Sequence, residues 1–153
     1  MATGTLFHYY KSKDELIVAL YADIKEKMAK VLEVAVVWKS DFRGTFRSVH
    51  LNMLNWAMEH PTEFRFLEQF QTSPFLSYIS KEEIKKQTAP HMALLEAAME
   101  AKAIKASPPY LIYTMITSQI FAVNQYIEQS DLSDSQKRQV VEESFEMIWK
   151  MLQ

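Results

Sequence analysis

Near the start of the chain lies the stretch Gly4-Thr5-Leu6-Phe7-His8-Tyr9-Tyr10-Lys11-Ser12-Lys13-Asp14-Glu15-Leu16. A short aromatic run is followed there by the start of a helix. The Ser12 side chain can accept a hydrogen bond from the backbone N–H of Glu15, and the Glu15 side chain can reach back to the N–H of Ser12, as in a capping box. We therefore expect a short helix, a tight turn at Lys11–Ser12, and a long helix that begins at Lys13.

The same stretch resembles the end of the helix-turn-helix in the tetracycline-repressor-like (TetR) family of bacterial transcription factors. That family carries a Gly-Thr-Leu-Tyr-Xaa-(His/Tyr)-Phe-Xaa-(Ser/Asn)-Lys-Glu-Xaa-Leu pattern, which forms the recognition helix and opens the next helix. The resemblance implies that residues 1–15 are a remnant of the DNA-binding domain, and that residues 16–153 form the ligand-binding and dimerisation domain. Only three residues precede Gly4, so we expect the earlier helices to be missing. Natural truncation, proteolysis and a misplaced start codon would each explain this.

The resemblance also implies which residues meet operator DNA in the full-length protein. It places Thr3, Gly4 and Thr5 at the start of the recognition helix. His8 would then lie toward the bases, Tyr9 toward a phosphate, and Lys13 toward the DNA backbone. Hydroxyl, imidazole and ammonium groups suit these contacts. Phe7 departs from the family's usual tyrosine. Because the buttressing helix is missing, we expect this chain to bind DNA weakly and without sequence preference.

Composition favours an all-α fold. The 153 residues suffice for one domain with a real core. Only two glycines and five prolines are present, which leaves little material for β-hairpins. We expect helices to begin at Lys13, Ser40–Asp41, Pro61, Lys81, Tyr110 and Ser133–Asp134. Pro90 should kink or divide the helix that contains it. Residues 104–109, IKASPP, resemble a connection often seen in the family, although a glycine commonly precedes it there.

Composition also limits the function. A net charge of −2 gives no global attraction to nucleic acid. The chain has no cysteine, which excludes disulfides and thiolate chemistry, and we expect a cytoplasmic protein. The four histidines lack the spacing of a metal-binding helical bundle, and three serines are explained as helix caps. We therefore expect neither an enzyme nor a cofactor or metal site.

The segment Tyr110–Ile127 is free of charged residues. It approaches the length of a membrane span. However, its threonine, serine, glutamine and asparagine residues are too many polar groups for an isolated span. We expect a buried helix and no membrane association.

One face of this uncharged helix, together with aromatic residues of the preceding helices, predicts a small-molecule pocket. It mixes aromatic rings with isolated polar groups, as ligand pockets do. The predicted lining is Met53, Trp56, Phe70, Tyr113, Thr117, Phe121 and Asn124. Because ionic residues are lacking, we expect a neutral or amphipathic ligand with an aromatic or acyl body rather than a small anion.

The opposite face of that helix and the last helix predict a homodimer. The last helix carries two adjacent apolar stripes, so one should face its own domain and the other a second copy of the chain. We assign to the interface Met115, Ser118, Ala122, Gln125, Val141, Phe145, Ile148 and Leu152. The second stripe consists of Val140, Met147 and Met151.

The resemblance thus implies a ligand-responsive TetR-like regulator, expected to be a repressor, in which a small molecule shifts the first long helix. The alternative is a helical dimeric ligand carrier or interaction module that has no role on DNA.

Overall fold

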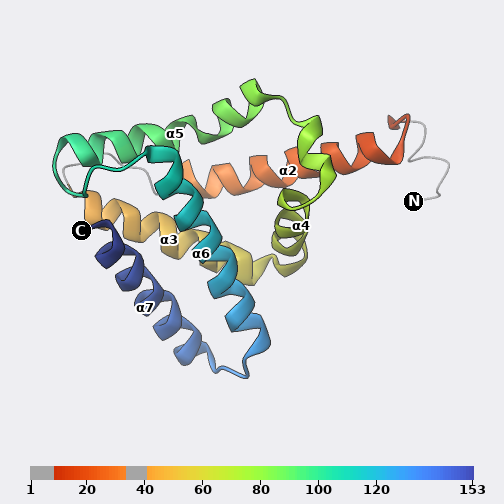
Figure 1. Ribbon diagram of the computed structural model, residues 1–153. Coiled ribbons are helices and arrows are strands. Elements are labelled where there is room, and N and C mark those ends of the chain that lie inside the picture. Colours follow the sequence, from red (N-terminus) through yellow and green to blue (C-terminus); the bar gives the residue numbers. More distant parts are fainter. Residues whose placement is uncertain (1–8, 34–40) are drawn as a thin grey trace.

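The computed structural model describes residues 9–33 and 41–153. These residues form six α-helices and one 3-10 helix, and no strand occurs among them (Figure 1). In chain order the elements are α2 (Lys13–Glu33), α3 (Phe42–Glu59), α4 (Pro61–Gln71), η1 (Pro74–Tyr78), α5 (Lys81–Glu100), α6 (Pro109–Gln129) and α7 (Asp134–Leu152). The all-α prediction is confirmed. Helix α2 runs without interruption across residues 15 and 16, so the domain boundary placed there stays a prediction.

Local side-chain chemistry explains where the helices begin. The Asp41 carboxylate accepts a hydrogen bond from the Gly44 N–H at 2.8 Å, and Ser80 Oγ accepts one from the Glu83 N–H at 3.1 Å. A complete capping box opens α7 at Ser133. Each cap satisfies a backbone donor that has no partner within its helix.

The cap at the start of α2 differs slightly from the prediction. Ser12 Oγ accepts a hydrogen bond from the Glu15 N–H at 3.2 Å, as expected. The Glu15 carboxylate, however, accepts from the backbone N–H of Lys11 at 2.8 Å rather than from that of Ser12. The side chain of Glu15 thereby fixes the tight turn itself.

Helix α5 contains Pro90 but is not divided by it, because α5 runs as one helix from Lys81 to Glu100. Its end has the pattern of a Schellman motif. The N–H of Ala103 donates to the carbonyl of Ala98 at 2.9 Å, and the N–H of Lys102 donates to that of Met99 at 2.9 Å. Lys102 has a φ of 57°, the left-handed conformation that glycine adopts most readily. The glycine of the family's connection therefore has a structural counterpart at Lys102.

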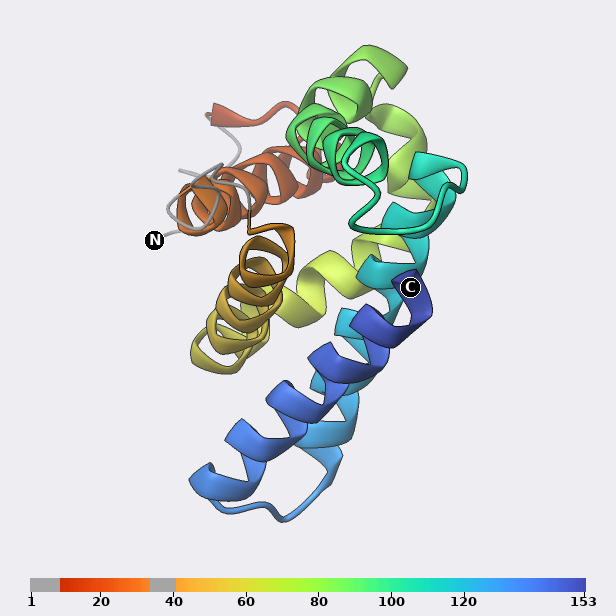
Figure 2. The same ribbon diagram turned by 90° about the vertical axis from the view of Figure 1, so that its left-hand side faces the viewer.

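The helices pack around two adjoining hydrophobic clusters. The first joins α2, α3, α4, α6 and the first half of α7, and includes Tyr21, Ile24, Leu54, Phe64, Leu67, Ile120 and Val141. The second joins α3, α5, α6 and α7, and includes Phe46, Leu94, Leu95, Ile112 and Phe145. Helix α6 contributes to both clusters. Figures 1 and 2 show α6 and α7 as a neighbouring pair joined by a short connection, with α2 and α5 running along the other side of the molecule.

The structure corrects the predicted use of the two stripes on α7. The first stripe consists of Val141, Phe145, Ile148 and Leu152, which are at most 3% exposed within the single chain. These four residues therefore fill the chain's own core, and their assignment to the dimer interface is wrong. On the neighbouring stripe, Met147 is 64% exposed. The sequence could not choose between the stripes, because both are apolar and only the packing partners decide which one turns inward.

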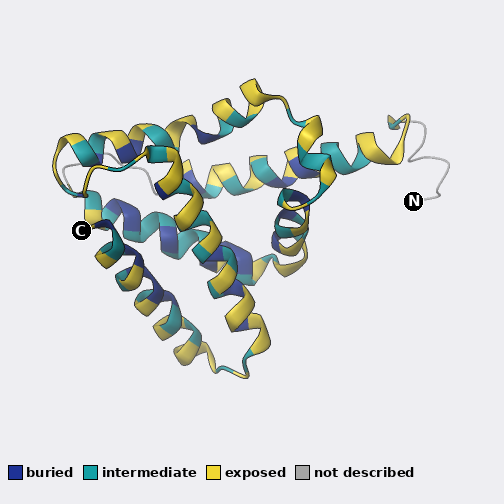
Figure 3. Ribbon diagram, viewed as in Figure 1, coloured by how far each residue is buried: buried dark blue, intermediate teal, exposed yellow. Residues whose placement is uncertain are grey.

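On α6, the four residues assigned to the interface are exposed: Met115, Ser118, Ala122 and Gln125. Figure 3 shows exposed positions along the outer sides of α6 and α7. No helix in the described ranges is both long and apolar enough to cross a membrane.

Polar contacts hold α3 against α7. Arg43 pairs with Glu146, and Arg47 forms a two-point contact with Glu142. Behind these ion pairs, His50 Nε2 lies 2.8 Å from the hydroxyl oxygen of Ser144, and both residues are buried. The contact satisfies one ring nitrogen of His50 inside the core.

Candidate ligand-binding site

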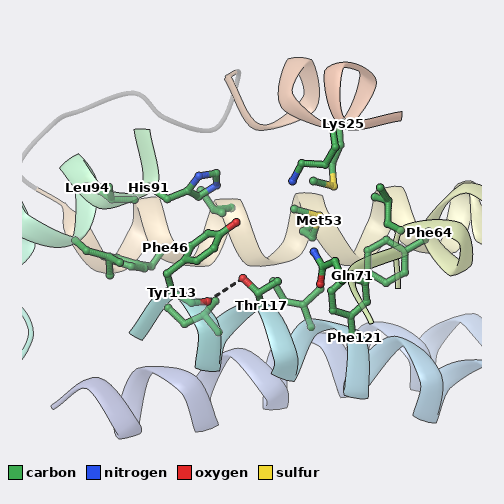
Figure 4. A pocket seen from close by; sticks show the side chains of 16 residues that line it. Lys25, Phe46, Met53, Phe64, Gln71, His91, Leu94, Tyr113, Thr117 and Phe121 are labelled. Atoms are coloured by element: carbon green, nitrogen blue, oxygen red, sulfur yellow. Dashed lines mark hydrogen bonds between the residues drawn. The ribbon is translucent and has the colours of Figure 1, made fainter. Parts of the chain in front are cut away.

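The candidate site is a cavity enclosed by five helices, α2 to α6 (Figure 4). This space, which we call the inner cavity, has a volume of about 80 Å³. Among its lining residues are Met28 from α2, Phe46 and Val49 from α3, Leu67 from α4, and Leu94 from α5. Most of the lining is aliphatic, aromatic or thioether, so the cavity favours apolar groups.

A wider cleft of about 760 Å³ lies outside the inner cavity, mainly between α2 and α5. Five residues line both spaces: Lys25, Met28, Val49, His91 and Leu94. The inner cavity and the outer cleft therefore meet at these residues.

Four of the seven residues predicted to line a pocket lie in the wall of the inner cavity. They are Met53, Tyr113, Thr117 and Phe121. Tyr113 and Thr117 are one helical turn apart on α6, and the Thr117 hydroxyl donates a hydrogen bond to the Tyr113 carbonyl at 2.8 Å. The prediction that the uncharged helix presents this face to a cavity therefore agrees with the geometry.

The other three predicted residues belong to the core and do not line the cavity. Trp56 is 4% exposed and stacks on His60 with ring centroids 4.8 Å apart. Phe70 stacks on Tyr21. Asn124 is buried, and its Oδ1 has no hydrogen-bond partner in the structure. Aromatic or polar character alone does not distinguish a packed side chain from one that faces a cavity.

The prediction missed two ionisable residues in the wall, Lys25 and His91. Figure 4 shows their nitrogen atoms directed toward the same end of the cavity, with the Tyr113 hydroxyl nearby. The sequence holds a signal for Lys25. Its neighbours Lys27 and Lys30 form i,i+4 pairs with acidic residues, whereas Tyr21 and Ala29 occupy the corresponding positions around Lys25.

The electrostatics of this end reflect burial. Burial lowers the pKa of Lys25. Burial also lowers the pKa of His91, and the charge of Lys25 adds to that effect. The pKa of Tyr113 is raised by burial, which the Thr117 side chain partly opposes. Each group is therefore biased toward its neutral form, and a negatively charged partner would reverse that bias for Lys25 and His91.

The arrangement suits the binding of a small molecule. In the described ranges, no group of three or more histidine, cysteine, aspartate or glutamate side chains is placed to hold a metal ion. The polar groups instead gather at one end of an otherwise apolar cavity, where they can orient a ligand.

Most residues predicted to contact DNA lie outside the described residues: Thr3, Gly4, Thr5 and His8. Tyr9 is 75% exposed, and Lys13 is exposed as the first residue of α2. Their roles on DNA stay predictions.

An all-helical domain that encloses an apolar cavity beside an exposed helical face is typical of a small-molecule-binding domain. Comparison with known families is more specific, since residues 21–153 match the tetracyclin repressor-like C-terminal domain. This chain belongs to the tetracyclin repressor-like (TetR) family of ligand-responsive transcription regulators. The family resemblance inferred from residues 4–16 is confirmed by a separate and longer part of the chain.

Solved structures show the same fold. A protein from Shewanella sp. PV-4 assigned to the TetR family of transcription regulators is 21% identical with a TM-score of 0.84, and the match covers 99% of this chain and 81% of that one. A TetR family transcription regulator from Marinobacter aquaeolei VT8 is also 21% identical, with a TM-score of 0.80 and coverage of 98% and 78%. A protein of unknown function from Rhodococcus sp. RHA1 is 15% identical, with a TM-score of 0.76 and coverage of 94% and 74%. At these identities the likeness concerns the fold.

Proposed function

We propose that this chain senses a small molecule in the inner cavity, which is enclosed by helices α2 to α6. Binding of the molecule would alter the contact with operator DNA through a movement of α2. The role is regulatory, expected to be repression, and not enzymatic, and the protein acts in the cytoplasm. One observation carries the proposal. Helix α2 begins at Lys13, directly after the stretch that resembles a recognition helix, and supplies Lys25 and Met28 to the cavity wall.

A ligand that displaces the middle of α2 would also displace its first turn. In a dimer, the spacing of two recognition helices must match the spacing of the DNA half-sites. A displacement smaller than the rise of one helical turn, about 5.4 Å, would then be enough to weaken operator binding.

We further propose a homodimer formed by the outer faces of α6 and α7. Exposed large apolar side chains gather on these two helices: Tyr110, Leu111, Met115, Tyr126 and Met147. Small or polar residues lie between them, including Ser118 and Ala122, and allow a partner helix to approach. Exposed apolar surface of this kind is typical of a subunit interface. The family match favours this regulator over a carrier module without a role on DNA.

The proposal is tested by measuring how far apart the two α2 helices lie in the dimer. Because the chain has no cysteine, one nitroxide label can be attached through Lys13→Cys, and its distance to the partner's label measured by pulsed electron paramagnetic resonance. Adding the small molecule that co-purifies with the protein, identified by mass spectrometry, should change this distance by several ångströms. A label at the exposed Asp131, in the connection between α6 and α7, should barely move. An unchanged distance at position 13 would contradict the proposed role of α2.

A further inference from the structure

Lys25 is a cation without an ionic partner in the cavity wall. In the described part of the chain, the ion pairs do not include Lys25. Three carboxylates line the outer cleft. Glu26 pairs with Lys30, and Glu83 accepts a hydrogen bond from Gln87 at 3.0 Å. The third, Glu33, is the last residue of α2, about two helical turns from Lys25, and forms no ion pair with it. Removing an ammonium group from water without a counter-charge costs free energy. The energy is recovered if an anion binds there.

His91 provides a second polar group at the same end. It lines both the inner cavity and the outer cleft, and its ring centroid lies 5.4 Å from that of Tyr113. Its Nδ1 is buried and has no hydrogen-bond partner in the structure. Buried polar atoms are nearly always hydrogen-bonded in folded proteins. An unpaired ring nitrogen beside an unpaired ammonium group therefore points to a ligand with an acceptor group.

The opposite end of the cavity is apolar. Phe64 and Phe121 lie there with ring centroids 4.9 Å apart, and Figure 4 shows Met53 between them and Lys25. Gln71 is the polar exception at this end. A ligand that fills the site must therefore combine one charged end with an apolar body.

We propose that the ligand is an amphipathic carboxylate, whose carboxylate group binds Lys25 and His91 and whose alkyl or aryl body points toward Phe64 and Phe121. This inference rests on the proposed sensing function and specifies the class of molecule that is sensed. The outer cleft, which shares Lys25 and His91 with the inner cavity, is the route by which such a ligand would enter.

Other ligand classes fit the site less well. A cationic ligand would be repelled by Lys25. A neutral ligand of the same shape would leave the half-buried ammonium group of Lys25 without a counter-charge. A small inorganic anion would pair with Lys25 but leave the apolar end unfilled, and so would gain nothing from burying apolar surface.

The test uses a series of straight-chain carboxylates from butanoate to decanoate, compared with acetate and with the matching alcohols. Calorimetry at pH 7 should show that affinity rises with chain length, and that octanoate binds at least tenfold more tightly than acetate or 1-octanol. The alcohols keep the body but lack the charge, whereas acetate keeps the charge but lacks the body. The comparison therefore measures each end of the site separately.

Lys25→Met provides the matching variant, because it keeps an unbranched side chain and removes the charge. It should weaken octanoate binding by about 10- to 100-fold, the range expected when a hydrogen bond between charged groups is lost. Binding of 1-octanol should change by less than twofold. The control is Lys27→Met, which removes a lysine from the exposed side of the same helix and should leave both affinities unchanged, because neither Lys27 nor its partner Asp23 lines the cavity or the cleft.

Each contrary outcome has a defined meaning. Equal binding of octanoate and 1-octanol, unaffected by Lys25→Met, overturns the carboxylate assignment while leaving the cavity as a binding site. Acetate binding as tightly as octanoate overturns the amphipathic assignment. Failure of the whole series to bind also overturns the inference, and the label distances between the two α2 helices then decide separately whether the sensing function stands.

Discussion

Tyr21 of α2 stacks on Phe70 of α4, with ring centroids 4.0 Å apart and an interplanar angle of 13°. The Tyr21 hydroxyl donates a hydrogen bond to Gln87 of α5 at 3.3 Å. Burial raises the pKa of Tyr21 to about 12, so the hydroxyl stays protonated as a donor. Position 21 therefore fixes α2 between two of the helices that enclose the cavity, one turn before Lys25.

Phe70→Ala should lower the free energy of unfolding by about 3–5 kcal/mol, because Phe70 is 3% exposed and its ring covers Tyr21. Chemical denaturation followed by circular dichroism measures this loss. Tyr78→Ala removes an aromatic ring that is 61% exposed and serves as the control, with an expected loss well below 1 kcal/mol. Similar losses in the two variants would contradict the importance of the stacked pair.

Trp56→Ala should destabilise the protein without altering ligand binding. The indole is part of the core and lies outside the cavity wall, so the expected loss is about 3–5 kcal/mol. Octanoate affinity, measured by calorimetry well below the melting temperature, should change by less than twofold. Met53→Ala is the comparison, because Met53 lines the cavity and its truncation should change the affinity more than the stability. If Trp56→Ala changed the octanoate affinity more than the stability, Trp56 would belong to the ligand site.

Lys102→Gly should stabilise the protein by about 1 kcal/mol, because Lys102 has a φ of 57° and a side chain is disfavoured in the left-handed region. Thermal or chemical unfolding measures the gain. Lys102→Ala removes the charge but keeps Cβ, and it should give no comparable gain. If both variants stabilise the protein equally, charge rather than backbone conformation is responsible.

His50 should make stability depend on pH. Burial lowers its pKa from 6.5 to about 4, although a backbone hydrogen bond with Val141 and the charge of Glu142 oppose this. Between these values the unfolded chain binds more protons than the folded one, so stability is fully present above pH 6.5 and is lost as pH falls toward 4. The contribution of this residue is about 3 kcal/mol.

Between pH 7 and pH 4, the free energy of unfolding should therefore fall more steeply for the native sequence than for His50→Gln. The glutamine keeps a donor for Ser144 but cannot titrate. His91 also contributes a slope of the same sign, since its pKa is lowered too. Identical slopes for the native chain and His50→Gln would show that His50 does not titrate in this way.

Met147→Glu should convert the dimer to a monomer that remains folded, because Met147 is exposed on the outer face of α7. A carboxylate placed in an apolar interface without a partner is unfavourable. Phe145→Glu places the same charge in the chain's own core, where Phe145 is fully buried, and should unfold the protein. Sedimentation velocity combined with circular dichroism distinguishes the two. A folded, dimeric Met147→Glu variant would place the interface elsewhere.

The helices were predictable because their ends depend on nearby residues. Asp41, Ser80 and Ser133 cap their own helices, and Pro61 stands in the first turn of α4. The family was also predictable from local sequence, because its helix-turn-helix motif is matched by one continuous stretch, residues 4–16. Pro90 is the exception among these local signals, because α5 accommodates it without ending.

The faces of the helices were harder to predict, because they depend on residues far apart in the chain. Phe145 and Met147 are both apolar and nearly adjacent, yet one is in the core and the other is exposed. Lys25 resembles the other lysines of α2 when composition alone is considered. Its place in the cavity becomes clear only when α5 brings His91 to the same space.

The last two residues of the chain are tied to the connection between α5 and α6. The N–H of Lys105 donates to the Leu152 carbonyl at 2.8 Å, and the Gln153 side-chain amide donates to the Ala103 carbonyl at 2.9 Å. During synthesis on the ribosome, residues 103–105 are exposed long before their partners have been made. The cavity wall formed by α5 therefore reaches its final anchorage only after Leu152 and Gln153 have been made, and a nascent chain that still lacks α7 should be a target for chaperones.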